Sequence, residues 1–238
     1  MKRTHLLLLG ILMAVMFLSG YGFHSALAQQ DNATAQTAQK LPPDIRPESL
    51  SRMSWPTRDE FASEEEKAAY DHVVKAAPQA ANMKGPVGPT ATRLHLPVVA
   101  EAYFTAFSWL REKTGLAPRY VELAILIGTR EANNPYEWLQ HERGSVKVLP
   151  REAVEVVRSG KDTKGLDEKD AVLIQFGREL YHQPTVSAKT FADAERLFGR
   201  NGTLTATLLM GHYTLNALML RAYNQQLAPG DKPPFATP

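Results

Sequence analysis

From Pro97 almost to its end, the chain is a succession of helix-length apolar segments separated by proline and glycine. Within each segment apolar residues recur three or four positions apart, as they do on one face of a helix. No segment alternates between apolar and polar residues for long enough to predict a strand. The sequence therefore predicts an all-α protein with a compact bundle of several helices.

Local signals mark where individual helices begin and end. Ser63 followed by Glu66 forms a capping box, and Pro78 stops the helix that it opens. Asn134 and Pro135 form a second start signal, and the helix that begins at Pro118 is apolar on nearly every side, which predicts a central, buried position. We expect a loop over residues 80–97 and helices over residues 63–77, 97–113, from 118, 134–147, 150–158, 167–182, 187–198 and 203–223.

The first 28 residues have the organisation of a secretory signal peptide. Lys2 and Arg3 precede an apolar run from Leu6 to Leu18, and Ala26-Leu27-Ala28 offers small residues at the cleavage positions. The apolar run is shorter than the roughly 20 residues that span a bilayer. We expect cleavage after Ala28, a periplasmic or secreted protein, and no stable membrane span in the mature chain. An uncleaved anchor is the alternative.

The remaining chain divides into a disordered tether and extended Pro-rich arm (29–58), a helical domain (59–230) and a C-terminal tail (231–238). Without Lys2 and Arg3, 25 basic residues balance 25 acidic ones, so charge gives no reason to expect a nucleic acid partner. The chain contains no cysteine, which excludes disulfides, thiol catalysis and thiolate metal sites.

Glu137 and His141 are the first candidates for chemistry. They lie four residues apart on one predicted helix, so their side chains share a face. Glu122 lies on the preceding helix, and the short turn between the two helices allows it to approach the pair. Two carboxylates and an imidazole in a semi-buried cleft push their pKa values apart, as acid–base chemistry requires. The alternative is an ordinary surface pair that contributes a few tenths of a kcal/mol.

Aromatic and polar neighbours extend this candidate site. Tyr136 and Trp138 flank Glu137 and are candidates to wall an apolar pocket, although packing explains them equally well. His212 lies next to Tyr213 and four residues before Asn216, and it is either a substrate contact or a core histidine. Carboxylates and imidazole also suit zinc, iron or manganese, but the spacing matches no strong metal motif. Neither a metal nor another cofactor is therefore expected.

Several segments together resemble the carboxymuconolactone decarboxylase family of the alkylhydroperoxidase D-like superfamily. The resemblance runs from about residue 59 to residue 229 and is carried by Glu122-Leu-Ala-Ile-Leu, Tyr136-Glu137-Trp138, His141, Gly85-Pro86, Leu94-His95-Leu96-Pro97 and His212-Tyr213. It implies an alkylhydroperoxidase D-like bundle. It also implies a homo-oligomer, either a trimer or a hexamer.

Peroxidase members of this superfamily carry a glutamate, two cysteines separated by two residues, and a histidine four residues after the second cysteine. On that spacing Glu122 matches the glutamate and His141 the histidine, whereas Asn134 and Glu137 stand at the two cysteine positions. Neither residue can attack a peroxide or resolve the product as a thiol does. Peroxiredoxin or hydroperoxidase activity is therefore not expected.

The decarboxylase branch of the family fits the residues better, because it transfers protons on a carboxylated lactone. Glu137 as general base, His141 as proton shuttle and Glu122 as their partner would suit such a reaction. Candidate substrate contacts are Asn134, Tyr136, Trp138 and His212. We expect cofactor-free decarboxylation, isomerisation or hydrolysis of a small carboxylated or lactone-like molecule.

The alternative is a non-catalytic binding or scaffold protein that kept the fold. It predicts that Glu122, Glu137 and His141 are exposed to solvent and pair with unrelated neighbours.

Overall fold

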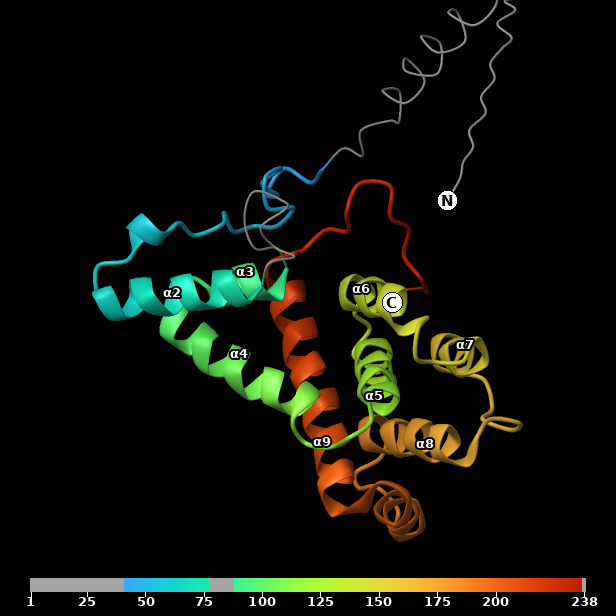
Figure 1. The fold of residues 1–238 in the computed structure, drawn as a ribbon. Helices are drawn as coiled ribbons and strands as arrows, with labels where there is room; N and C mark the ends of the chain where they lie inside the picture. The colour runs from blue at the N-terminus through green and yellow to red at the C-terminus, as the bar shows by residue number, and fades with distance from the viewer. Residues whose placement is uncertain (1–40, 78–87, 237–238) are drawn as a thin grey trace, which may run out of the picture. The chain divides into compact units, whose positions relative to one another are not determined.

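The computed structural model describes residues 41–77 and 88–236, and these form an all-α fold, as predicted (Figure 1). The helices are η1 (a 3₁₀ turn, Arg58–Glu60), α2 (Glu64–Ala76), α3 (Pro89–Arg93), α4 (Pro97–Glu112), α5 (Pro118–Glu131), α6 (Pro135–Ser145), α7 (Arg151–Ser159), α8 (Glu168–His182) and α9 (Ala188–Ala222). Within the described residues there is no strand, and no helix is long and apolar enough to cross a membrane. The expected signal peptide (1–28) and the tether up to residue 40 lie outside the described residues.

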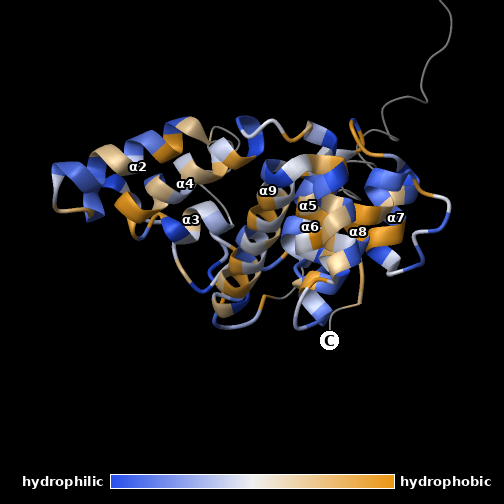
Figure 2. Cartoon of the chain, turned by 90° about the horizontal axis from the view of Figure 1, so that it is seen from below, coloured by the Kyte–Doolittle hydropathy of each residue, from blue (hydrophilic) through white to orange (hydrophobic). Residues whose placement is uncertain are grey.

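Helix α5 lies at the centre of the main core, because nearly every side of it is apolar. All its residues from Val121 to Thr129 except Glu122 are buried, and it packs against α6, α7, α8 and α9. Hydrophobic residues gather where α5, α8 and α9 meet (Figure 2). The burial expected from the sequence is confirmed.

The contact between α5 and α9 is especially close at Gly128. A Cβ atom at this position would lie 3.0 Å from Met210 Cα and 3.2 Å from the Met210 carbonyl oxygen. Any larger residue would therefore push the two helices apart. Because α5 carries Glu122 and α9 carries Tyr213, this contact helps to set the distance between two polar side chains described below.

Two predicted helix starts are observed at the expected residues. The Ser63 hydroxyl accepts a hydrogen bond from the Glu66 amide, and the Glu66 carboxylate accepts one from the Ser63 amide, so the capping box precedes α2. The Asn134 side chain likewise accepts a hydrogen bond from the Glu137 amide, and Pro135 occupies the first turn of α6. The second of these caps fixes the start of α6, the helix that carries Glu137 and His141.

One other assignment differs from the structure. Residues 89–93 were expected in a loop, but they form the short helix α3, which Pro89 begins. The last two expected helices are observed as the two segments of α9, which meet at Gly199, where φ is 69° and ψ is 169° and the backbone is not helical. The helix resumes directly after this glycine, so the chain bends there without an intervening loop. Gly85-Pro86 lies outside the described residues.

Helices α2, α3 and α4 form a second, smaller core beside the first. Val73, Leu94 and Ala100 are buried together in it. Helix α4 joins the two cores, because it packs against α2 on one side and against α9 on the other.

The Pro-rich arm, residues 41–56, is attached to the C-terminal end of α9. The Ser51 hydroxyl and the Arg52 amide both donate hydrogen bonds to the Tyr223 carbonyl oxygen. The Gln225 side chain donates to two further carbonyl oxygens of the arm. The arm is therefore an integral part of the folded domain.

Candidate functional site

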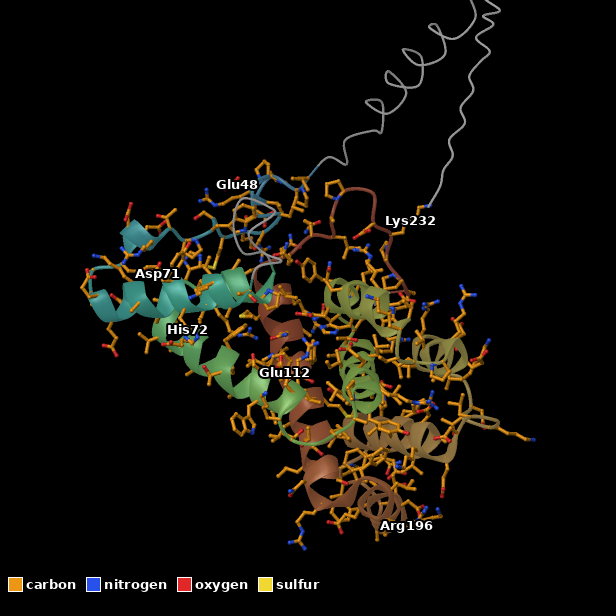
Figure 3. All side chains as sticks on the ribbon, in the orientation of Figure 1. Glu48, Asp71, His72, Glu112, Arg196 and Lys232 are labelled. Carbon is orange, nitrogen blue, oxygen red and sulfur yellow. The ribbon has the colours of Figure 1, made fainter. Side chains whose placement is uncertain are left out.

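A cavity of about 930 Å³ opens between the arm, α4, α6 and α9. Its volume is near the upper end of the roughly 300–1,000 Å³ that is usual for small-molecule sites. Glu48 of the arm and Glu112 of α4 are among the lining residues (Figure 3). Other polar and aromatic lining residues include Arg93, Tyr103, Phe107, Arg111, Tyr136, Glu137, His141, His212, Tyr213 and Asn216.

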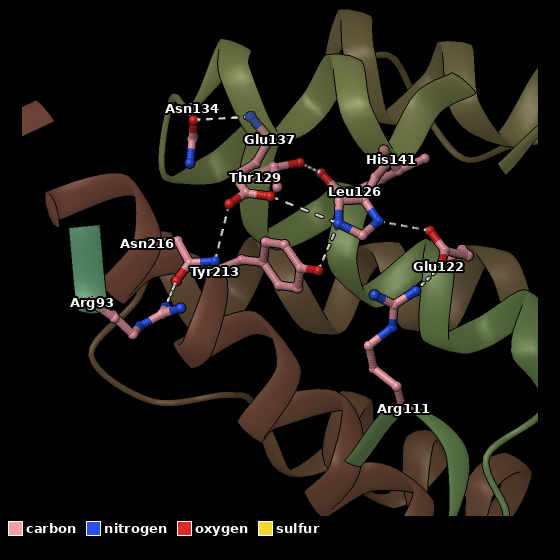
Figure 4. A network of polar contacts seen from close by, with 10 residues as sticks. All are labelled: Arg93, Arg111, Glu122, Leu126, Thr129, Asn134, Glu137, His141, Tyr213 and Asn216. Atoms are coloured by element: carbon pink, nitrogen blue, oxygen red, sulfur yellow. Dashed lines mark hydrogen bonds and ion pairs between the residues drawn. The ribbon is translucent and has the colours of Figure 1, made fainter. Parts of the chain in front are cut away.

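The hairpin of α5 and α6 brings Glu122 to His141, as the sequence predicts. Asn133 makes the turn with a φ of 51°, a left-handed conformation that asparagine tolerates. Glu122 Oε2 lies 3.0 Å from His141 Nδ1, and Arg111 donates a hydrogen bond of 3.1 Å to the other carboxylate oxygen (Figure 4).

This arrangement fixes the charge on Glu122 and the orientation of the imidazole ring. Burial alone would raise the pKa of Glu122, but the hydrogen bonds and positive charges of His141 and Arg111 outweigh it, so the pKa is lowered. Glu122 is therefore a carboxylate and accepts a hydrogen bond from the Nδ1–H group of His141.

The other ring nitrogen of His141 faces two groups that line the cavity. Its Nε2 lies 2.6 Å from the Tyr213 hydroxyl and 3.7 Å from Glu137 Oε2 (Figure 4). Because Nδ1 carries a proton toward Glu122, Nε2 accepts the hydrogen bond from Tyr213 when the ring is neutral. Burial raises the pKa of Tyr213 well above its usual value, which keeps this hydroxyl a donor.

Glu137 is a buried carboxyl group with few hydrogen-bonding partners. Glu137 is 5% exposed. Among the described residues only the side-chain amide of Asn216 donates a hydrogen bond to its carboxylate, at 3.1 Å. Burial raises the pKa of Glu137, and the nearby positive charges of His141 and Arg93 offset only part of that effect. A carboxyl group with a raised pKa gains and loses a proton at higher pH than an exposed glutamate does.

Arg93, at the end of α3, belongs to the site although sequence reasoning missed it. Its guanidinium donates to the Asn216 side-chain oxygen and lies 5.4 Å from the centre of the Tyr103 ring (Figure 4). Arg93 and Asn216 are 123 residues apart, and no local spacing connects them. Arg111 was missed for the same reason. For Asn216 the available signal was its position one helical turn after His212.

Of the four expected substrate contacts, Tyr136 and His212 line the cavity, whereas Asn134 and Trp138 are not among its lining residues. The Asn134 side chain caps α6. Trp138 is fully buried, where its indole donates to Glu142 and packs edge-on against Phe235. Successive residues of a helix differ in direction by about 100°, so Trp138 can point into the core although Glu137, the residue before it, faces the cavity.

His212 is part of an aromatic wall. Its ring stacks on Phe107 with centroids 3.7 Å apart and an interplanar angle of 8°. Burial, together with the positive charges of Arg93 and Arg111, lowers the pKa of His212 to about 3. This histidine is therefore neutral at physiological pH and offers a flat surface rather than a proton.

Within the described residues, no group of three or more His, Asp or Glu side chains is arranged to hold a metal ion. In comparisons with known proteins, no protein family and no curated protein matches this chain.

Proposed function

We propose that this protein is an enzyme that uses Glu137 and His141 for cofactor-free acid–base chemistry on a small carboxylated or lactone-like molecule. One observation carries the proposal: a buried carboxyl group with a raised pKa lines a cavity, 3.7 Å from an imidazole nitrogen. Buried ionisable groups with shifted pKa values in a cavity are typical of catalytic sites.

Decarboxylation, isomerisation and hydrolysis all require a proton to move at the reacting atom. In the proposed reaction Glu137 takes a proton from the substrate or from water, and His141 exchanges protons with it through Nε2. Glu122 holds the imidazole ring in place and stabilises it when it is protonated, as the carboxylate does in other carboxylate–histidine pairs. Tyr213 donates to the same nitrogen while the ring is neutral, and its oxygen can accept a hydrogen bond from Nε2 once the ring is protonated.

The sequence resemblance supports the same chemistry. We extend the proposal to membership of the carboxymuconolactone decarboxylase family, with the lyase branch favoured because no cysteine is present for thiol peroxidase chemistry. The signal-like residues 1–28 support action in the periplasm or outside the cell.

The alternative, a binding or scaffold protein without chemistry, requires the three residues to be exposed and apart. The side chains of Glu122, His141 and Glu137 are instead 16%, 14% and 7% exposed, and His141 lies within 4 Å of both carboxylates. This convergence favours the enzyme.

We also propose a homo-oligomer, a trimer or hexamer, that associates through the outer face of α9. Leu204, Leu208, Leu215 and Leu218 are exposed on this face, and with Gly211 they follow the alternating four- and three-residue spacing of helices that pack together. An exposed apolar stripe of this kind is typical of a protein interface. Light scattering at micromolar concentration should give an oligomer that Leu208→Glu dissociates. A monomeric wild-type protein would remove this proposal.

The proposed activity is tested first by a thermal-shift screen of the purified protein against small lactones, hydroxy acids and unsaturated dicarboxylates. A ligand at about 100 times its dissociation constant adds roughly 2.7 kcal/mol to the free energy of unfolding. Each ligand that binds is then incubated with wild type and with Glu137→Gln, and products are measured by mass spectrometry. We expect turnover by the wild type alone. Full turnover by Glu137→Gln, or binding without turnover across the panel, would contradict the proposal.

A further inference from the structure

Two arginines line the cavity, and their charges are compensated differently. Arg111 donates to the Glu122 carboxylate at 3.1 Å, so its charge is paired. Arg93 donates to the neutral amide oxygen of Asn216 and forms no ion pair with the described residues. Arg93 thus brings a positive charge to the cavity wall without a bonded carboxylate among the residues that the structure describes.

The shape of the guanidinium indicates which ligand would compensate that charge. Its N–H groups form a planar fork that matches the two oxygens of a carboxylate, and a single hydrogen bond to Asn216 leaves most of them free for a ligand. Charge-assisted pairs of this kind are about twice as strong as neutral hydrogen bonds. Because Arg93 is partly buried, an anion beside it would be less screened by water than one on the surface.

The wall next to Arg93 is aromatic. The guanidinium lies over Tyr103, whose ring is tilted by 46° against that of His212 at a centroid distance of 6.4 Å, and His212 stacks on Phe107. A ligand that carries a carboxylate on a flat, unsaturated body would place its charge on Arg93 and its planar face against one of these rings.

Asn216 connects this position to the proposed base. It accepts a hydrogen bond from Arg93 and donates one to Glu137 at 3.1 Å, so one residue lies between the cation and the carboxyl group. A carboxylate bound to Arg93 would therefore lie on the same wall as Glu137, with Asn216 between the two groups.

We propose that Arg93 is the anion receptor of the cavity and selects small, flat carboxylates over their neutral analogues. The inference rests on the proposed function, because it assigns one part of the substrate to a residue of the same cavity.

The test uses benzoate and benzamide, which share a flat ring and differ in charge. Their affinities for the purified protein are measured by calorimetry with wild type, Arg93→Gln, Arg93→Lys and Glu137→Gln. The control is Arg151→Gln, which removes an exposed arginine at the start of α7. We expect the wild type and the control to bind benzoate about tenfold more tightly than benzamide, as a charge-assisted hydrogen bond predicts. Arg93→Gln should lose this preference, and Arg93→Lys should keep part of it.

A second measurement covers the case in which Arg93→Gln does not fold. The wild-type protein is treated with phenylglyoxal, which modifies arginine side chains, and peptides are mapped by mass spectrometry. Benzoate should protect Arg93, and benzamide should not. Equal affinity of the wild type for both probes, preference retained in a folded Arg93→Gln, or protection of Arg111 instead of Arg93 would each overturn the inference.

The outcomes separate this inference from the proposed function. If Glu137→Gln keeps full turnover while Arg93→Gln loses the preference for benzoate, the anion receptor stands and the proposed base is wrong. If Glu137→Gln loses turnover while Arg93→Gln keeps the preference for benzoate, the proposed base stands and Arg93 is not the anion receptor.

Discussion

Two buried glutamates, Glu137 and Glu179, are treated very differently by this fold. Both residues expose little surface, 5% and 6%, but the carboxyl group of Glu137 loses more of its hydration than that of Glu179. Glu137 accepts one hydrogen bond from the described residues, from Asn216. Glu179 accepts three, at 3.0, 2.7 and 2.8 Å, from the side chains of Gln175 and Thr190 and the amide of Ser187.

The two carboxyl groups have opposite shifts in pKa, because they differ both in hydrogen-bond donors and in how deeply they lie among protein atoms. The hydrogen bonds from Gln175 and Thr190 lower the pKa of Glu179 to about 2, whereas burial raises the pKa of Glu137. Glu179 joins α8 to the N-cap of α9 and so serves the structure. Glu137 faces a cavity and remains available to a ligand. A buried carboxyl group is thus a better candidate for chemistry when the protein leaves it with few donors.

The largest expected difference between the two glutamates is in turnover. Glu137→Gln should reduce kcat/KM by about 10²–10⁴-fold on an identified substrate, because an amide cannot act as a base. Glu179→Gln should leave kcat/KM within a few fold of the wild-type value, measured per folded protein. Steady-state kinetics on both variants checks this, and equal losses would remove the functional distinction between them.

Glu122 tests whether the partner of His141 matters to the same reaction. Glu122→Gln should lower kcat/KM by about 100-fold, because the imidazole would lose the carboxylate that orients it. The matched control is Glu131→Gln, which alters another glutamate of α5. Glu131 lies 2.7 Å from His182, and neither residue lines the cavity. Similar kinetics for the two variants would show that Glu122 does not act through His141.

The effects on stability should be in the reverse order, with the larger loss in Glu179→Gln. Glu179→Gln should lower the free energy of unfolding by about 1–3 kcal/mol, because an NH₂ group would replace an acceptor of hydrogen bonds. Glu137→Gln should cause a smaller loss or a gain, since it removes a buried charge that few groups compensate. Urea unfolding followed by circular dichroism measures both, and a larger loss for Glu137→Gln would reverse the comparison.

The smallest expected effect is a difference in pH dependence. The folded-state pKa of Glu179 lies below its unfolded value of about 4.3, so its contribution to stability is present above that pH and is lost as the pH falls toward 2. Glu137 has a raised folded-state pKa, so the wild type loses stability relative to Glu137→Gln as the pH rises above the unfolded value.

Urea midpoints measured from pH 2 to pH 8 check these signs. The advantage of the wild type over Glu179→Gln should disappear in acid. Its disadvantage against Glu137→Gln should grow with pH, and a trend in the same direction for both variants would contradict the assignment.

Much of the fold follows from local signals. The apolar residues after Pro118 predict the buried helix α5, and the Ser63 capping box predicts the start of α2. The pairing of Glu122 with His141 was also predictable, because a short turn between two helices leaves little choice of arrangement. These features depend on residues that are near in sequence.

The rest of the site depends on contacts that local patterns do not encode. Tyr213 and His141 are 72 residues apart, and their hydrogen bond follows from the packing of α9 against the α5–α6 hairpin. Arg93 reaches Asn216 only because α3 packs against α9. Trp138 shows the opposite error, since a residue beside Glu137 in sequence points away from it in a helix.

The attachment of the arm to the end of α9 has a consequence for folding order. Ser51 and Tyr223 are 172 residues apart, and contacts that close so long a loop are expected to form late. Pro47, Ser49 and Leu50 of the arm also line the cavity. As the chain folds, the cavity wall would therefore remain incomplete until the last helix has formed and the arm has joined it. A chain truncated before Tyr223 would lack the attachment for the arm and could not present the finished binding site.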